Sequence, residues 1–566
     1  MVNLKEKPFY LKEEDIKWVE ETIAGMTTEE KIGQLFVYMV TNRDPAVMKS
    51  VLDRFHVGAI RYHNAPKEEL YEQNRILQEN SKIPLLIASN CEAGGNGGIE
   101  GGTAVANGAA VAAADSEELA YEMSCVGASE SAAVGCNWNF APVVDLLFNW
   151  RNTIVQTRAF NDSPEDTIRY AKAFMRGAKE KGFATCCKHF PGDGTEENDQ
   201  HLLMGINDLS CTQWDNTFGR VYQELIDDGV MTIMAGHIAL PSYQRKLHPG
   251  LKNEEILPAT LSPELITGLL KEKMQFHGLV VTDASHMIGM FAAMPRKEQV
   301  PRAIAAGCDC FLFFNDPEED FGYMLEGYRS GIITEERLKD ALYRILGVKA
   351  AIGLHRKQAE GTLMPPREAL EVVGCREHRW IAKKAADQFI TLVKDTQSIL
   401  PLTPEKSRRL KLVFIGGGEG MVVAGKLIKD NSEEVKKQLI RLLQQQGFQV
   451  DAQTPQGKGK MEDFQAKYDA CIVALHVTGF AQYNSMRVKW ASPADQPWYV
   501  SQIPTIFLSL GFPNHLIDVP MARTYINAYL DSETVMEAAI EKIMGKSEFK
   551  GRYQENVFCG RWDTRL

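Results

Sequence analysis

Short apolar runs alternate with helical patterns along the first part of the chain, and this alternation constrains the fold most. Eight runs have the length and composition of buried strands: Leu35–Val40, Val57–His63, Pro84–Asn90, Gly135–Leu146, Gly182–Phe190, Val230–Pro241, Gly278–Asp283 and Cys308–Asn315. Most are separated by patterns typical of helices, at Glu117–Ala133, Ser163–Lys181, Cys211–Asp228, Ser262–Met274 and Lys297–Ala306. Eight such alternations fit an α/β fold of the (β/α)₈ TIM-barrel type better than an open doubly wound sheet.

The remainder of the chain predicts a second, smaller α/β layered (sandwich) domain. Its strand patterns are Lys411–Ile415, Phe448–Ala452, Ala470–Leu475, Thr505–Leu510 and Thr524–Tyr529, with helical patterns at Glu433–Gln446 and Glu533–Met544. The Pro365-Pro366 pair marks a linker between the two parts. We therefore predict a catalytic barrel over residues 1–360, a linker over 361–380 and a C-terminal domain over 381–566.

Length and charge exclude several classes of protein. A chain of 566 residues is too long for one hydrophobic core. The net charge of −11 and a pI near 5.7 argue against a nucleic acid or an anionic membrane as partner. The N-terminus carries no apolar signal region, and the apolar runs are too short to cross a bilayer, so we expect a cytoplasmic protein. The sequence does not predict an oligomeric state.

The cysteine pattern predicts free thiols and no metal site. Eleven cysteines are scattered along the chain, and Cys186 and Cys187 are adjacent within a predicted buried strand. An odd number without framework spacing does not indicate disulfides. Because no Cys/His spacing matches a zinc site either, we expect neither a metal nor an organic cofactor.

Polar side chains gather where the predicted barrel strands end. Barrel enzymes place their chemistry at the carboxyl ends of the strands, so these residues are candidates for one shared site. They are Asn90, Glu92, Asp145, Lys188, His189, His237 and Asp283.

The segment after the fifth predicted strand is the densest in ionisable groups. Pro191, Gly192 and Gly194 end any regular element and predict a loop. Asp199 and His201 follow two residues apart, a spacing at which the carboxylate can accept the Nδ1 proton of the imidazole. This contact fixes the tautomer and makes His201 a candidate acid/base near neutral pH.

The string K-H-F-P-G-D-G, four further residues and D-Q-H, over 188–201, resembles the signature of family 3 glycoside hydrolases of the β-N-acetylglucosaminidase type. The resemblance implies that Asp199 and His201 form the acid/base pair and that Lys188 and His189 reach the sugar hydroxyls. Val280-Val281-Thr282-Asp283 is similar to the family segment that carries the covalent nucleophile, which implies this role for Asp283.

Further motifs of the same family imply other sugar contacts. Arg158 stands in a segment similar to R-[AS]-F, Asp145 ends one similar to N-F-A-P-V-x-D, and His237 ends one similar to M-x-x-H. We take all three as candidate substrate-binding residues, although Asp145 can instead bind Lys188 or Arg158.

The chain departs from the family pattern in two places. Many members have D-x-E-G-G-x-V followed by an arginine, where this chain has Asn90-Cys91-Glu92-Ala93-Gly94-Gly95-Asn96, so Asn90 or Glu92 is the candidate for hydroxyl recognition. The usual D-D-L-S-M is replaced by Asp283-Ala284-Ser285-His286-Met287, which leaves the role of His286 open.

Two alternatives concern individual segments. Glu196 and Glu197 lie in the same loop as His201 and are rival general acids. The glycine-rich segments 94–108 and 416–420 are interpreted as a flexible loop and a plain turn, rather than as contacts to a ligand or a phosphate.

The resemblance implies a retaining exo-β-N-acetylglucosaminidase that acts through a glycosyl-Asp283 intermediate on small saccharides from cell-wall fragments or chitin. Three alternatives remain. Phosphorolysis is one, because a neutral imidazole repels phosphate less than a carboxylate does. A β-glucosidase is less favoured, since those relatives lack the D-x-H loop. A sugar-binding sensor is disfavoured by the joint presence of Asp283, Asp199 and His201.

Overall fold

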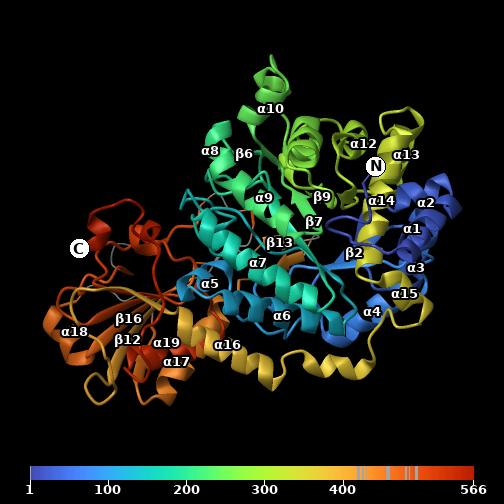
Figure 1. Ribbon diagram of the computed structural model, residues 1–566. Coiled ribbons are helices and arrows are strands. Elements are labelled where there is room, and N and C mark those ends of the chain that lie inside the picture. The colour runs from blue at the N-terminus through green and yellow to red at the C-terminus, as the bar shows by residue number, and fades with distance from the viewer. Residues whose placement is uncertain are drawn as a thin grey trace. The chain divides into compact units, whose positions relative to one another are not determined.

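The computed structural model in Figure 1 describes residues 2–416, 421–423, 426–428, 430–453, 459–477, 481–482, 485–490 and 495–566. The turn expected at 416–420 lies outside this range from residue 417 onward. Contacts divide the chain into two compact units. The first comprises 1–104, 120–148 and 162–378, and the second comprises 105–119, 149–161 and 379–566. Each unit is described by itself, and the predicted domain boundaries stay a prediction.

Eight parallel strands of the first unit close into a barrel, which confirms the predicted fold (Figure 1). Their order around the barrel is β1-β10-β9-β7-β5-β4-β3-β2, which follows the order along the chain. Each strand falls within its predicted apolar run or ends one residue beyond it. The bounds are β1 (Phe36–Val40), β2 (Ala59–Tyr62), β3 (Leu86–Ser89), β4 (Trp138–Asn139), β5 (Ala184–Phe190), β7 (Thr232–Ala235), β9 (Leu279–Ala284) and β10 (Cys310–Leu312).

Helices connect these strands, and their apolar faces pack on the barrel (Figure 1). Ser163 caps α7 by accepting a hydrogen bond from the Asp166 amide, and Pro164 occupies the first turn, where its missing N–H costs nothing. The main helices of the unit are α3 (Pro45–Phe55), α4 (Lys67–Glu79), α6 (Glu117–Ala133), α7 (Pro164–Glu180), α9 (Phe218–Asp228), η5 (Glu264–Lys273), α12 (Arg296–Ala306), α13 (Pro317–Arg329) and α14 (Glu335–Ala351).

Two predicted strands differ from the structure in extent. Only β4 forms within the run 135–146, because Pro142 has no N–H to donate to a ladder and the pairing with β5 continues only as an isolated bridge. The run 230–241 divides into β7 and β8 (Ile238–Ala239), and β8 pairs with β6 (Gly205–Ile206) in a separate two-stranded sheet. This small ladder anchors the end of the loop that carries His201.

The second unit contains a six-stranded sheet of order β11-β18-β17-β16-β12-β15, which confirms the predicted α/β layered domain. Only β11 runs antiparallel to its neighbour. The strands are β11 (Thr391–Asp395), β12 (Arg409–Ile415), β15 (Gln449–Asp451), β16 (Ala470–Leu475), β17 (Thr505–Ser509) and β18 (Thr524–Asn527), and the longest helices of this part are α16 (Arg376–Phe389), α17 (Ser432–Gln445) and α19 (Glu533–Ile543).

The glycine-rich segment 94–108 is fixed in its first part, where the sequence indicated a flexible loop. The buried carboxylate of Glu130 accepts hydrogen bonds from the Thr103 amide at 2.8 Å and the Thr103 hydroxyl at 2.7 Å. A Cβ on Gly95 would lie 1.8 Å from Glu130 Oε2, so only glycine fits against this carboxylate.

The eleven cysteines all lie within the described residues and are free thiols, as predicted. Across the part of the chain that the structure describes, no helix combines the length and apolar character needed to span a bilayer.

Candidate active site

Asp283 lies near the carboxyl end of β9, at the barrel rim. Its side chain is 14% exposed, and its Oδ1 accepts a hydrogen bond from the Ala284 amide at 2.7 Å. Burial opposes ionisation of this carboxyl, but the nearby His189 imidazole and the Ala284 amide hold its pKa below the ordinary value. Asp283 is therefore an ionised carboxylate on a rigid strand, with a face open to solvent.

His189 lies on β5 between two carboxylates. Its Nδ1 is 2.7 Å from Asp145 Oδ2, and its Nε2 is 4.0 Å from Asp283 Oδ2. Donation from Nδ1 to Asp145 orients the ring toward Asp283. The ring of His189 is thereby held between the buried Asp145 and the candidate nucleophile.

Asp145 is surrounded by protein groups on β5 and in the loop that follows it. Its side chain is fully buried, and its Oδ1 accepts from the His189 amide at 3.0 Å and the Asp193 amide at 2.8 Å. Burial raises the pKa of this carboxyl, but the charge and hydrogen bond of His189 outweigh burial and lower it. The sequence grouped Asp145 with the sugar-binding residues. The structure instead gives both oxygens to protein groups, because the chain after β4 runs beside β5.

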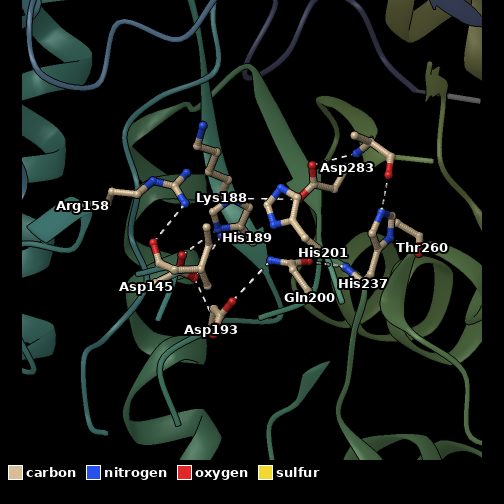
Figure 2. Close-up of polar contacts among 12 residues, drawn as sticks. Asp145, Arg158, Lys188, His189, Asp193, Gln200, His201, His237, Thr260 and Asp283 are labelled. Atoms are coloured by element: carbon tan, nitrogen blue, oxygen red, sulfur yellow. Dashed lines mark hydrogen bonds and ion pairs between the residues drawn. The ribbon is translucent and has the colours of Figure 1, made fainter. Parts of the chain in front are cut away.

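Asp199 and His201 form the pair that the sequence predicted. His201 Nδ1 is 2.7 Å from Asp199 Oδ1, which also accepts the His201 amide at 2.8 Å. The Asp199 side chain is fully buried, whereas that of His201 is 26% exposed. With Nδ1–H donated to the carboxylate, Nε2 is the nitrogen available for proton transfer. His201 also acts electrostatically on Asp283, and Figure 2 shows the two groups together with His189.

The rival acids in the same loop are placed differently. Glu196 Oε1 accepts a hydrogen bond from the Ile206 amide on β6, and its Oε2 accepts from Asn198 at 2.7 Å. Burial raises the pKa of Glu196. Its carboxylate thus ties the loop to β6, while Glu197 is exposed. The geometry favours His201 as the group that faces Asp283.

Lys188 pairs with Glu92 across the barrel rim. The Lys188 Nζ lies 2.6 Å from Glu92 Oε1, and the two side chains are 3% and 20% exposed. Asn90, which follows β3, has a buried Oδ1 without a hydrogen-bond partner among the described residues. The structure therefore brings Lys188 and Glu92 together and leaves Asn90 with an unused acceptor.

His237 is fully buried. Its Nδ1 accepts from the Thr260 hydroxyl at 3.0 Å, and its Nε2–H donates to the Ala284 carbonyl at 2.9 Å. Burial lowers its pKa to about 4, so the ring is neutral. The sequence grouped His237 with the sugar-binding residues, but the structure engages both ring nitrogens with the protein, since this residue follows β7 inside the rim.

Two further candidates, Arg158 and His286, make the following contacts. Arg158 ends η2 (Gln156–Arg158) in the second unit, where its guanidinium donates to the Ile154 carbonyl at 3.4 Å, so its contact with sugar stays a prediction. His286 stacks on Phe313, with ring centroids 6.3 Å apart, and burial, followed by the charge of His201, lowers its pKa.

Sequence reasoning missed three residues that the structure adds to the site. Asp193, Gln200 and Thr260 carry polar contacts around the nucleophile (Figure 2). Asp193 and Gln200 stand inside the 188–201 string, where their positions could have suggested a role. Thr260 lies outside that string, and its contact with His237 could not be deduced from the sequence, because the two residues are 23 positions apart.

Together these groups can perform a two-step displacement. One ionised carboxylate and one imidazole with an available nitrogen lie on neighbouring elements of the rim. A carboxylate can attack an anomeric carbon while the imidazole transfers a proton to and from the leaving oxygen.

Residues 27–348 match the profile described as the glycosyl hydrolase family 3 N terminal domain. The chain belongs to glycoside hydrolase family 3. Its barrel is that family's catalytic fold, and the chain is a glycosidase of this family. A curated relative from Cellulomonas fimi, named beta-N-acetylglucosaminidase/beta-glucosidase, is 37% identical over 573 residues and covers 100% of both chains.

Other relatives of this family 3 enzyme span different lengths. A beta-hexosaminidase from Chromobacterium violaceum is 32% identical over 203 residues, covering 36% of this chain and 53% of that protein. The solved structure of the beta-glucoside phosphorylase BglX has a TM-score of 0.92 and 39% identity over 99% of both chains. A family 3 beta-N-acetylglucosaminidase from Paenibacillus sp. shares the fold, with a TM-score of 0.76 and 24% identity over 93% of this chain and 98% of that chain.

Proposed function

We propose that this family 3 enzyme is a retaining exo-β-N-acetylglucosaminidase that releases terminal GlcNAc from small saccharides such as cell-wall fragments or chitooligosaccharides. The observation that carries the proposal is the pairing of an ionised Asp283 with a His201 whose Nδ1 is held by Asp199. The relatives named beta-N-acetylglucosaminidase and beta-hexosaminidase support the choice of sugar.

In the first step, an Asp283 oxygen attacks the anomeric carbon and forms an ester bond. The glycosidic C–O bond breaks, and His201 Nε2–H protonates the departing oxygen. In the second step, His201 is neutral and takes a proton from water. The water oxygen attacks the anomeric carbon, and Asp283 is released as a carboxylate. Asp199 stabilises the imidazolium form of His201 at the start and end of this cycle.

Sugar binding uses Lys188 on β5 and the residues that follow β3. Lys188 remains a donor to hydroxyls while Glu92 balances its charge, and the unused Oδ1 of Asn90 accepts from a hydroxyl or the acetamido N–H. Asp145 acts through His189 as a positioning residue.

The test is turnover of matched aryl N-acetyl-β-glucosaminide and aryl β-glucoside by the wild type and by Asp283→Ala. We expect the variant to lose nearly all activity on both sugars, and we expect the wild type to favour the N-acetylated sugar. A fluorinated GlcNAc donor should leave one glycosyl adduct, located on the peptide that contains Asp283. Equal rates for wild type and variant, or an adduct elsewhere, would overturn the assignment.

Phosphorolysis is a second candidate, which the 39% identity to a beta-glucoside phosphorylase over 99% of both chains favours. In this reaction phosphate replaces water in the second step, and His201 takes the proton from phosphate. A neutral imidazole repels that anion less than a second carboxylate would. ³¹P NMR of reactions with and without phosphate distinguishes the two candidates. GlcNAc-1-phosphate as the main product would assign a phosphorylase, and free GlcNAc at an unchanged rate would assign a hydrolase.

A further inference from the structure

Gln200, between the two residues of the acid/base pair, is unusual in the loop after β5. Its side chain is buried, with 1% of the residue exposed, whereas Glu197 and Asn198 just before it are exposed. Burying an amide is unfavourable unless both of its ends are hydrogen-bonded. Gln200 Oε1 accepts from the His237 amide at 2.8 Å, and its Nε2 donates to Asp193 Oδ2 at 3.3 Å.

These two contacts close a ring of interactions around the nucleophile (Figure 2). On one side, the His237 ring donates to the carbonyl of Ala284, the residue after Asp283. On the other side, the Asp193 amide donates to the buried Asp145, which holds His189 beside Asp283. The side chain of Gln200 is therefore the link that attaches the His201 loop to both neighbours of the nucleophile.

The main chain of the loop docks on the segment that follows the nucleophile. The Ile288 amide donates to the His201 carbonyl at 3.1 Å, and the Gly289 amide donates to the Gln200 carbonyl at 3.2 Å. A Cβ on Gly289 would lie 2.7 Å from the Gln200 carbonyl oxygen and 2.8 Å from that of Leu203. Real Cβ atoms do not approach a backbone oxygen so closely, so the loop can seat here only against glycine.

From these contacts we propose that Gln200 is a positioning residue that fixes the His201 side chain relative to Asp283. Gly289 provides the space in which the His201 loop packs against the segment after the nucleophile. The proposal rests on the proposed function, since it requires His201 to be the proton donor. Gln200 touches neither substrate nor the reacting atoms. It acts by keeping His201 Nε2 at the height of the glycosidic oxygen, where a displacement of about 1 Å costs about a hundredfold in rate.

Leaving-group dependence tests this role more directly than overall activity. A 2,4-dinitrophenyl leaving group is so weakly basic that it departs without protonation, whereas a phenyl or alkyl group needs the proton. We expect Gln200→Met, which keeps the length but removes both hydrogen bonds, to lower kcat/KM for the phenyl and alkyl N-acetyl-β-glucosaminides by about 10-fold to 100-fold. The kcat/KM of the dinitrophenyl substrate reports only the first step, in which Asp283 attacks without help from the acid, and should change by less than about threefold.

Gly289→Ala is a second, independent way to displace the loop, because it leaves Gln200 intact and adds a methyl group beneath the loop. It should give the same selective loss, and combining it with Gln200→Met should add little, since both unseat one loop. The matched control is Gly322→Ala, whose Cβ meets nothing within 4 Å. This control should behave as the wild type.

The parent variant His201→Ala separates failure of this inference from failure of the proposed function. If His201→Ala lowers kcat/KM only for the substrates that need protonation, while Gln200→Met and Gly289→Ala lower it for all substrates equally or for none, the positioning role is wrong and the acid/base assignment stands. If the kcat/KM of His201→Ala shows no dependence on the leaving group, the acid/base assignment fails first. A retained kcat/KM for the dinitrophenyl substrate in each variant demonstrates that the barrel is folded.

Discussion

His189 Nε2 lies 4.0 Å from Asp283 Oδ2, while Nδ1 of the same ring lies 2.7 Å from the buried Asp145. The carboxylate proposed to attack the sugar therefore shares its imidazole neighbour with a second carboxylate that is fully buried. Because Asp145 fixes the ring, the charge on His189 acts on Asp283 from one defined direction. The ionisation of Asp283 follows from this arrangement.

His189→Asn should raise the pKa of Asp283. Burial favours the protonated acid, and the variant removes the largest opposing charge. Because attack requires the carboxylate, activity is lost as pH falls through this pKa. The acid limb of kcat/KM should therefore move to higher pH, by about one unit. His248→Asn, at a histidine 61% exposed, is the control. An unmoved acid limb would show that His189 does not set the ionisation.

His201→Ala should lower kcat by about a hundredfold or more on a phenyl N-acetyl-β-glucosaminide, because a positioned acid/base contributes about 10² to 10⁴. With the 2,4-dinitrophenyl substrate, whose glycosyl-enzyme forms without the acid, sodium azide should restore turnover by attacking that intermediate without a general base, and a β-glycosyl azide should accumulate. Asp199→Asn should give a smaller loss. Glu196→Gln is the informative comparison, because azide rescue of that variant instead would make Glu196 the acid/base.

The buried His237 should make the barrel less stable in acid. Its folded pKa is about 4, against an ordinary value of 6.5. Between these values the unfolded chain binds a proton that the folded chain does not, so the free energy of unfolding falls as pH decreases through this window, by about 3 kcal/mol in full. His237→Gln, whose amide can still donate to the Ala284 carbonyl, should lose this component. Urea unfolding at pH 7.5 and pH 4.5 measures this component. If the free energy of unfolding changed by the same amount between the two pH values in wild type and variant, the prediction would be refuted.

Lys349 on α14 is a second buried titrating group. It is fully buried, its Nζ donates to Gln34 Oε1 at 2.8 Å, and burial lowers its pKa to about 7. From pH 7 to the ordinary lysine value, the unfolded chain holds more protons, so wild-type stability rises with pH. Lys349→Met should therefore be more stable at pH 7 by about 2–4 kcal/mol, after allowing for the hydrogen bond lost by Gln34.

The advantage of Lys349→Met should shrink from pH 7 toward pH 10, because the wild-type lysine is then neutral in the fold and the unfolded lysine begins to lose its proton as well. Lys339→Met, on an exposed face of the same helix, is the control and should show no such trend. Thermal unfolding across this pH range gives the comparison, and a constant difference between Lys349→Met and wild type would exclude a titrating Lys349.

The barrel was predictable from sequence because strands buried on both faces read as unbroken apolar runs. The position of Asp283 at the end of such a run, and the spacing of Asp199 and His201, could likewise be recognised from the sequence alone. Contacts that form only when the barrel closes could not be predicted in this way. Nothing in the sequence pairs Lys188 with Glu92, which lie on β5 and after β3 with β4 between them.

The burial of polar residues was the other limit. Asp145 and His237 follow strands just as Asp283 does, and alternation alone cannot distinguish a side chain that faces the sugar from one that supports its neighbour. Both are enclosed because the chain after β4 and the β6–β8 ladder continue past the barrel strands. The burial of Gln200 could not be predicted either, because hydrophobic periodicity does not apply to a loop residue. Its two hydrogen-bond partners, His237 and Asp193, come close only when the loop folds back.

Because the loop that carries His201 is anchored by the β6–β8 ladder, the two proposed catalytic groups, Asp283 and His201, lie on separate structural elements. Asp283 belongs to a barrel strand, whereas the proposed proton donor, His201, lies on a connection that leaves after β5 and is secured by its own two-stranded sheet outside the barrel. Substitutions confined to the connection between β5 and β7 can therefore change the donor, its basicity and the acceptor it activates. The strand that carries Asp283 would stay as it is.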